Sequence, residues 1–361
     1  MKSALDKLTI KGFKSIQSLE DFELGKLNVM IGGNGAGKSN LIDFFRMLRA
    51  MMGGKLATYI KSHGGCDDYI FNGPKYTTRM EIKLKFKKHY EYSCSLLPTV
   101  DESFIIERET FGAHKFFGGL ESNLIEVKND KSSVEREDDE CLYQLISSFT
   151  VYHFHDTSER APMRRSEITA DNVRLRSDAS NIAPYLLKLK NKSSNVYSEI
   201  TEAVRLVTPF FDEFILDAEE YGQKQKVSLS WRQKGSDYPM QPYHLSDGSI
   251  RFICLATALL QPQPPATIII DEPELGLHPF AINVLAELIQ SAAKRTQLII
   301  ATQSPHLIDN FDPKDIVVVN RDNGASTFKR LEANELSEWL EDYSLGDLWR
   351  KNVVAGGPVH E

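Results

Sequence analysis

The chain has 361 residues, of which 41% are hydrophobic and 26% charged, and its formal net charge at pH 7 is −7. These values are typical of a soluble globular protein with a large core, and the negative charge argues against a protein that coats nucleic acid by bulk electrostatics. No apolar run approaches the ~20 residues that span a bilayer, and the N-terminus has no apolar signal core. Four scattered cysteines form no C-x-x-C pair. We therefore expect a cytoplasmic protein with reduced thiols and no membrane contact.

The first informative stretch is a glycine-rich segment between a predicted strand and a predicted helix. Residues 8–27 alternate between apolar and polar side chains, which predicts short antiparallel strands. The apolar run 27–31 then leads into Gly32-Gly33-Asn34-Gly35-Ala36-Gly37-Lys38-Ser39, in which the pattern G-x-x-x-x-G-K-S is complete. Residues 40–52 have the spacing of an amphipathic helix. The order strand, glycine loop and helix is that of a phosphate-binding loop.

The residue types of this loop fit the phosphates of a nucleotide. Glycines let successive backbone N–H groups point inward at the start of a helix, where they bind an anion. Lys38 reaches the β- and γ-phosphates, and the Ser39 hydroxyl holds Mg²⁺. The predicted nucleotide-binding residues of this part of the chain are Gly32, Asn34, Gly35, Gly37, Lys38, Ser39 and Asn40.

The next part of the chain predicts a sheet with one solvated face. Residues 78–86 alternate strictly, and further strands are expected over 90–97 and 103–109. Residues 127–140 are polar and acidic, which predicts a surface loop. Four lysines either form a basic edge for a polyanion or, as we favour, belong to the solvated face: Lys83, Lys85, Lys87 and Lys88.

Residues 149–156 predict a strand followed by a polar turn, in which His153 and His155 share a face. Two histidines without a third ligand are weak support for a metal site.

Residues 181–207 have helical spacing, so we expect a helical subdomain inserted between two halves of a sheet, and residues 226–231 are strand-like. Five arginines before the helices either contact nucleic acid or a partner protein or form a mixed-charge surface: Arg160, Arg164, Arg165, Arg174 and Arg176.

The second informative region begins at a serine that is placed to cap a helix. Ser246 precedes an apolar helical pattern over residues 250–260, and Gly248 allows the backbone to approach an anion closely. A helix is also predicted over 279–294. Buried β-branched strands are predicted over 266–271, 297–305 and 315–320, and the first of them exits through Asp271 and Glu272. Strands that alternate with helices in this way predict a parallel α/β sheet.

Together, these motifs resemble the ABC-type ATPase heads of the SMC, RecF and OLD group, and most of all its stand-alone bacterial AAA-family (RecF-like) ATPases. The resemblance covers about residues 1–90 and 240–320, and the segments 152–158 and 345–352 add to it. It implies an α/β fold of the P-loop NTPase, ABC-ATPase type, with a mixed or parallel central sheet, an antiparallel β lobe and an inserted helical subdomain. We divide the chain into an N-terminal ATPase lobe (1–150), an insert (151–244) and a C-terminal ATPase lobe (245–361).

The resemblance also implies a role for individual residues. Gly32 to Ser39 match Walker A, and residues 245–249 match the LSGGQ-type signature. Asp271 then fixes Mg²⁺ together with Ser39, and Glu272 orients or deprotonates the attacking water. Lys38, Glu272 and Gln303 are the predicted catalytic residues.

Two positions depart from the family pattern. Gln303 stands where the family usually has its switch histidine, and glutamine hydrogen-bonds a γ-phosphate but does not titrate near neutral pH. No glutamine matches the family's Q-loop, for which Asp67, Asp68 or Asn72 could substitute. Slow hydrolysis, or hydrolysis that needs a partner, would follow from both departures.

In the family, the signature of one subunit completes the nucleotide site of another. The resemblance thus implies an ATP-dependent homodimer, in which Ser246 and Gly248 of one chain bind the ATP of its partner. We expect an ATP-hydrolysing switch that regulates a separate effector protein, in DNA maintenance or anti-phage defence. An ATP-gated DNA-binding clamp of RecF type, with Arg164 and Arg165 as DNA contacts, is the alternative. A transporter ATPase fits less well, because the switch histidine and the Q-loop are missing.

Overall fold

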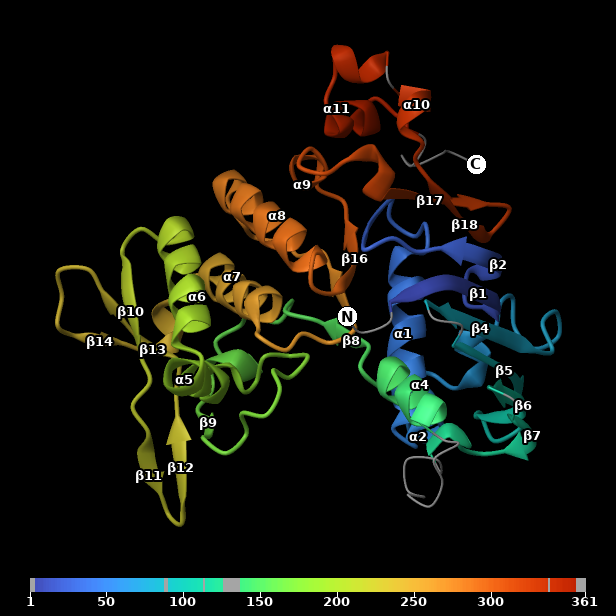
Figure 1. Cartoon of the computed structure of the whole chain (residues 1–361), viewed down its shortest axis with the longest axis horizontal. Coiled ribbons are helices and arrows are strands. Elements are labelled where there is room, and N and C mark those ends of the chain that lie inside the picture. The colour runs from blue at the N-terminus through green and yellow to red at the C-terminus, as the bar shows by residue number, and fades with distance from the viewer. Residues whose placement is uncertain (1–3, 88–89, 113, 126–136, 337, 355–361) are drawn as a thin grey trace.

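The computed structural model describes residues 4–87, 90–112, 114–125, 137–336 and 338–354. Within these residues, a mixed sheet runs through the centre of the molecule, and five of its six strands are parallel (Figure 1). The sixth, at one edge, pairs antiparallel with its neighbour. In spatial order the strands are β18 (Ala325–Arg330), β17 (Ile316–Asp322), β3 (Leu27–Ile31), β16 (Gln297–Thr302), β15 (Thr267–Asp271) and β8 (Thr150–Tyr152).

The central strands are apolar without alternation because both faces of the sheet are covered. Successive residues of β3 show this: Val29 belongs to one buried cluster and Met30 to the other. The cluster with Val29 contains α7 (Asp247–Leu260) and α8 (Pro279–Ala293), and the cluster with Met30 contains α1 (Lys38–Met52) and α4 (Glu137–Ser147). The glycine-loop helix and the Ser246 helix therefore lie on opposite faces of the sheet, as Figure 1 shows. The predicted fold class is confirmed.

An antiparallel sheet covers the far side of α1 (Figure 1). Its solvated face carries paired charges: Lys83 contacts Glu91 at 2.9 Å and Lys85 contacts Asp21 at 2.7 Å. This pairing fits the solvated face better than a basic edge, while Lys88 lies outside the described residues. In spatial order the strands are β2 (Ile16–Glu23), β1 (Leu5–Phe13), β4 (Met80–Phe86), β5 (Glu91–Pro98), β6 (Phe104–Phe111) and β7 (His114–Gly119).

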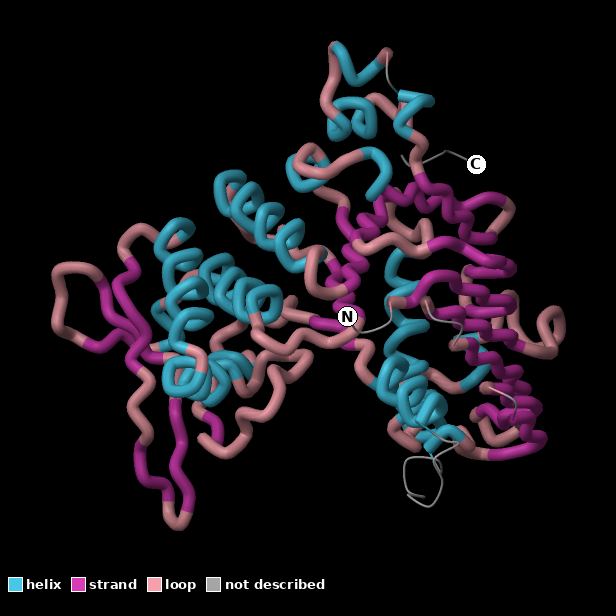
Figure 2. The backbone as a smooth tube through the Cα atoms, in the orientation of Figure 1, coloured by secondary structure: helices cyan, strands magenta, loops and turns pink. Residues whose placement is uncertain are grey.

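The middle of the chain forms two helices and two small sheets at the side away from the antiparallel sheet (Figure 2). The predicted helix over 181–207 is interrupted at Ser193, which separates α5 (Ile182–Lys192) from α6 (Ser194–Val207). The segment 226–231, predicted to be strand-like, contains the end of one strand and the start of another, which belong to two different sheets. One sheet consists of β10 (Phe211–Ile215), β13 (Ser230–Gln233) and β14 (Pro239–Met240). The other consists of β11 (Glu219–Tyr221), β12 (Lys224–Val227) and β9 (Glu167–Ile168).

The acidic loop predicted over 127–140 is corrected at its end. Residues 126–136 lie outside the described residues, but 137–140 form the first turn of α4. The helix continues because Leu142, Leu145 and Ile146 pack against the core around α1. Short helices complete the description: α2 (Leu56–Ser62), α9 (Pro305–Ile308), α10 (Ala333–Leu336) and α11 (Leu345–Arg350).

No helix in the described ranges has both the length and the apolar character that crossing a membrane requires. The proposed boundaries of the two ATPase lobes and the insert, at residues 150 and 244, stay a prediction.

Candidate nucleotide-binding site

The glycine loop joins the end of β3 to the start of α1. Lys38, the first residue of α1, is 6% exposed, and its Nζ donates to the carbonyl oxygens of Gly32 (2.7 Å) and Gly33 (3.0 Å). Burial lowers the pKa of Lys38, and the negative charges of Glu272 and Asp271 oppose this shift. The loop therefore surrounds the Lys38 ammonium group, which interacts with the charges of Glu272 and Asp271. Asn34, Gly35 and Ser39 are exposed.

Two serines that the sequence did not single out hold this loop in place. Ser326 Oγ, on β18, donates to the carbonyl oxygen of Ala36 (2.6 Å) and lies 2.6 Å from Ser15 Oγ. Asn40 Nδ2 donates to Ser15 Oγ (2.6 Å), so its amide is engaged by the support of the loop. Gly37 has φ +115°, and a Cβ there would lie 2.0 Å from Ser326 Oγ. Neither serine belongs to a sequence motif. Ser15 lies in the turn between β1 and β2, and Ser326 lies on the edge strand β18.

The predicted catalytic residues Glu272 and Gln303 are brought together at the carboxyl ends of β15 and β16. Gln303 Nε2 donates to Glu272 Oε1 at 2.6 Å. Glu272 has φ +42°, and its N–H donates to the carbonyl oxygen of Ala301 (2.8 Å). This backbone conformation is rarely adopted by a residue with a side chain, and such positions cluster at functional sites.

Asp271 ends β15 beside this pair. Burial raises the pKa of its carboxyl group. His155 Nε2 donates to its backbone carbonyl oxygen at 2.9 Å, which fixes a proton on that ring nitrogen. The ring centroids of His153 and His155 lie 4.2 Å apart, and no group of three His, Cys, Asp or Glu side chains that could hold a metal ion occurs in the described ranges.

Glu274 lies in the segment 274–278, which the family resemblance places at the D-loop, and it also contacts the end of β16. Its Oε1 accepts from Thr302 Oγ1 (2.5 Å) and from the backbone N–H of Gln303 (3.2 Å), while its Oε2 is buried without a hydrogen-bond partner. Burial raises the pKa of this carboxyl group. Glu274 therefore fixes the backbone at the residue whose side chain holds Glu272.

Ser246 caps α7 as predicted, because its Oγ accepts from the backbone N–H of Ser249 at 3.1 Å. Gly248 was predicted to approach an anion closely, and in the structure it packs on the backbone of Gly276. A Cβ on Gly248 would lie 2.5 Å from the Gly276 carbonyl oxygen. The start of α7 is therefore packed against the loop that follows β15. Whether Ser246 and Gly248 also contact an anion stays a prediction.

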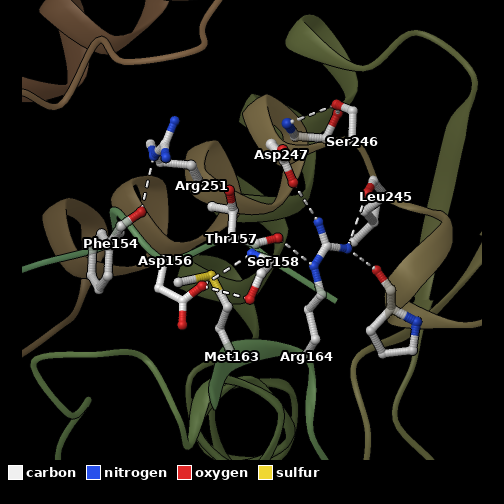
Figure 3. Close-up of polar contacts among 12 residues, drawn as sticks. Phe154, Asp156, Thr157, Ser158, Met163, Arg164, Leu245, Ser246, Asp247 and Arg251 are labelled. Atoms are coloured by element: carbon white, nitrogen blue, oxygen red, sulfur yellow. Dashed lines mark hydrogen bonds and ion pairs between the residues drawn. The ribbon is translucent and has the colours of Figure 1, made fainter. Parts of the chain in front are cut away.

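Arg164 is buried beneath the signature segment, as Figure 3 shows. Its guanidinium group donates to the carbonyl oxygens of Thr157, Pro242 and Leu245 and pairs with Asp247. The prediction that Arg164 contacts nucleic acid is wrong, because its side chain is only 5% exposed and its donors are engaged inside the chain. Arg165 is exposed and donates to the carbonyl oxygen of Arg160.

Arg251 on α7 is a second buried arginine of this region (Figure 3). It donates to the carbonyl oxygens of Phe154 (2.9 Å) and His155 (3.1 Å) and to that of Leu275. It thus joins the segment after β8, the signature helix and the loop after β15.

None of the three suggested substitutes for the Q-loop glutamine hydrogen-bonds the glycine loop in the described part of the chain: Asp67, Asp68 and Asn72.

Comparison with known proteins identifies one family. The model of a family described as "AAA domain, putative AbiEii toxin, Type IV TA system" matches residues 27–91 and 124–309. No curated protein sequence matches the chain.

Solved structures of Smc heads share the fold. A structure of an Smc head bound to the C-terminal winged-helix domain of ScpA has a TM-score of 0.64 at 15% identity, over 93% of this chain and 99% of that one. An Smc head with an extended coiled coil, bound to the C-terminal domain of ScpA from Pyrococcus furiosus, has a TM-score of 0.62 at 16% identity, over 94% and 99%. One with a coiled coil and joint from Pyrococcus yayanosii has a TM-score of 0.56 at 14% identity, over 94% and 99%. At these identities the likeness concerns the fold alone.

Two alanine substitutions test how the glycine loop is held. Gly37→Ala should lower the free energy of unfolding by more than the ~1–2 kcal/mol that a left-handed backbone costs a residue with a Cβ, because its Cβ also meets Ser326. Gly35→Ala is the matched control, since Gly35 also has a positive φ but open space around its Cβ position. Chemical denaturation without nucleotide measures both, and equal losses would contradict the proposed support of the loop.

Proposed function

Since the chain belongs to the AAA-domain family described as putative AbiEii toxin of type IV toxin–antitoxin systems, and has the fold of an ABC-type ATPase head, we propose that it is an ATP-hydrolysing switch that dimerises around ATP. The single observation that carries this proposal is the hydrogen bond from Gln303 to Glu272 (2.6 Å). In the glycine loop, backbone carbonyl oxygens hold Lys38, whose charge interacts with that of the same carboxylate. ATPase similarity at the family level supports the activity, and the residue roles are our proposal.

In this proposal each group of the site has a separate task. The backbone N–H groups at the start of α1 and the Lys38 ammonium group bind the phosphates. Glu272 orients the attacking water or takes its proton, and Gln303 holds the carboxylate of Glu272 in position. Ser39 and Asp271 offer the hard oxygen ligands that Mg²⁺ prefers, and the ion would neutralise phosphate charge when bound.

The arrangement of the two motifs supports a site shared between two chains. Helices α1 and α7 lie on opposite faces of the mixed sheet, and Ser246 at the start of α7 is exposed, so it can contact another molecule. Large apolar side chains are exposed close to the start of α7 (Tyr243, 60%), in the loop packed on it (Leu275, 46%) and in the first turn of α8 (Phe280, 53%). Exposed apolar groups around a polar helix start are what an ATP-dependent interface would bury.

The same proposal includes a separate effector protein that the ATP state controls, in anti-phage defence or DNA maintenance. The family description names a toxin–antitoxin system, and the Smc head of a similar fold is bound to a domain of ScpA. DNA binding stays an untested alternative, and it no longer has Arg164 as a contact.

Glu272→Gln should keep ATP binding, slow turnover by about a hundredfold or more, and accumulate a dimer, because the variant binds the phosphates but no longer activates water. Light scattering after size-exclusion chromatography with ATP measures the dimer, and phosphate release measures turnover. Lys38→Ala is the control and should lose both ATP binding and the dimer. Unchanged turnover in Glu272→Gln would remove this carboxylate from the mechanism.

Gln303→Ala should slow hydrolysis by about ten- to a hundredfold with little change in ATP affinity, because a hydrogen bond to a charged group contributes about 1.5–3 kcal/mol. Gln303→His keeps a donor at this position and should hydrolyse ATP faster than Gln303→Ala. Single-turnover kinetics separate binding from chemistry. If alanine leaves the rate intact, Gln303 does not position Glu272.

A further inference from the structure

A pocket of about 440 Å³ lies between the ATPase core and the middle segment of the chain. Its walls come from the last turn of α1, the start of β8, residues 173–175, α5 and residues 261–265. The charged residues that line it are Arg49, Arg174 and Lys188, and no carboxylate is among its described lining residues. The pocket is separate from the glycine loop, none of whose residues lines it.

The cations of this pocket are available to a ligand. Neither the Arg49 nor the Arg174 guanidinium group has a hydrogen-bond or ion-pair partner in the described part of the chain, and both side chains are exposed. Lys188 Nζ donates to the carbonyl oxygens of Asn172 (2.9 Å) and Val173 (3.1 Å), which fixes the ammonium group and leaves one of its three N–H donors free. The pocket therefore presents one fixed ammonium group, that of Lys188, and two guanidinium groups that are unpaired within the described residues, those of Arg49 and Arg174.

Two buried tyrosines add neutral donors to the same walls. Tyr152 is 1% exposed, and its hydroxyl oxygen accepts from Gln261 Nε2 (3.0 Å), so the hydroxyl proton remains available to an acceptor. The Tyr185 hydroxyl, on a side chain that is 5% exposed, makes no hydrogen bond to the described residues. Donors without acidic neighbours suit a ligand rich in acceptor oxygens.

The lining of this pocket is positively charged, in contrast to the chain as a whole. The chain as a whole has a net charge of −7. The adjoining pocket that shares Arg49 contains the cations Arg46 and Lys55 besides Asp43 and Asp178, and the one that shares Lys188 also contains Lys192. A hollow on the antiparallel sheet carries equal numbers of cations and carboxylates: Lys11, Arg79, Lys83 and Arg108 against Glu20, Asp21, Glu81 and Glu107. Three cations around a pocket of about 440 Å³ suit a small ligand with few negative charges.

We propose that the pocket formed by Arg49, Arg174 and Lys188 binds a small phosphate ester of nucleotide size. Its volume lies within the range of small-molecule sites, about 300–1,000 Å³, and guanidinium groups bind phosphate through paired hydrogen bonds. The site goes beyond the proposed ATPase function and does not depend on it. Arg49 nevertheless lies in the last turn of the helix that begins at Lys38, so the ligand contacts the same helix as ATP.

Isothermal titration of uridine 5′-monophosphate and of inorganic pyrophosphate tests the proposal. Both are titrated into Lys38→Ala protein, in which the phosphate affinity of the glycine loop is removed. At least one probe should bind, and its Kd should rise about tenfold or more when Arg49→Gln and Arg174→Gln are added, because two charge-assisted contacts are lost. Lys83→Gln with Lys85→Gln, on the antiparallel sheet, is the matched control and should leave the Kd unchanged.

Three results would overturn the proposal. They are the absence of binding by both probes, equal affinity with and without Arg49 and Arg174, and tight binding of a short single-stranded DNA that neither probe displaces. Uridine, which lacks the phosphate, should not bind. The two arginines are exposed, so the melting temperature of the variants should match that of the parent and exclude misfolding as the cause.

Discussion

The site depends on the parallel register of three buried strands. Ile31 of β3 is paired with Thr302 of β16, and Asp271 of β15 with Ala301. Parallel strands end at the same edge of a sheet, so the glycine loop, Gln303 and the Asp271–Glu272 pair emerge side by side although they are up to 271 residues apart in the chain. A shift of one residue in any of these pairings would displace the groups at one strand end by about 3.3 Å along the strand relative to the others.

A second set of contacts connects the signature helix with this edge. Arg251 binds the carbonyl oxygen of Leu275, and Gly248 packs on Gly276, so the loop after β15 is held against α7. Through Glu274 the same loop binds Thr302 and the backbone of Gln303. The start of α7 and the residue that holds Glu272 are thus joined by one short loop within a single chain. Arg164 holds the other side of the signature segment.

The parts of the site that a local pattern encodes could be predicted from the sequence. The glycine loop, the cap at Ser246 and the strand ending in Asp271 each consist of neighbouring residues with a regular spacing. Ser15, Ser326 and Arg251 could not be assigned, and neither could the contacts of Glu274, because these roles arise from contacts between distant segments. Arg164 was misassigned for a related reason: arginine in a polar stretch is usually exposed, and only the fold shows that backbone carbonyl oxygens surround it. The helical start of α4 was missed because its charged first turn precedes the apolar spacing.

The central claim, that each ATP site is built from two chains, is tested most directly by mixing two inactive variants. Lys38→Ala removes the lysine of the glycine loop, and Ser246→Arg blocks the signature. In an equal mixture part of the wild-type ATPase rate should return, because each mixed dimer has one intact composite site of two. A mixture that stays as inactive as its two components would contradict the shared site.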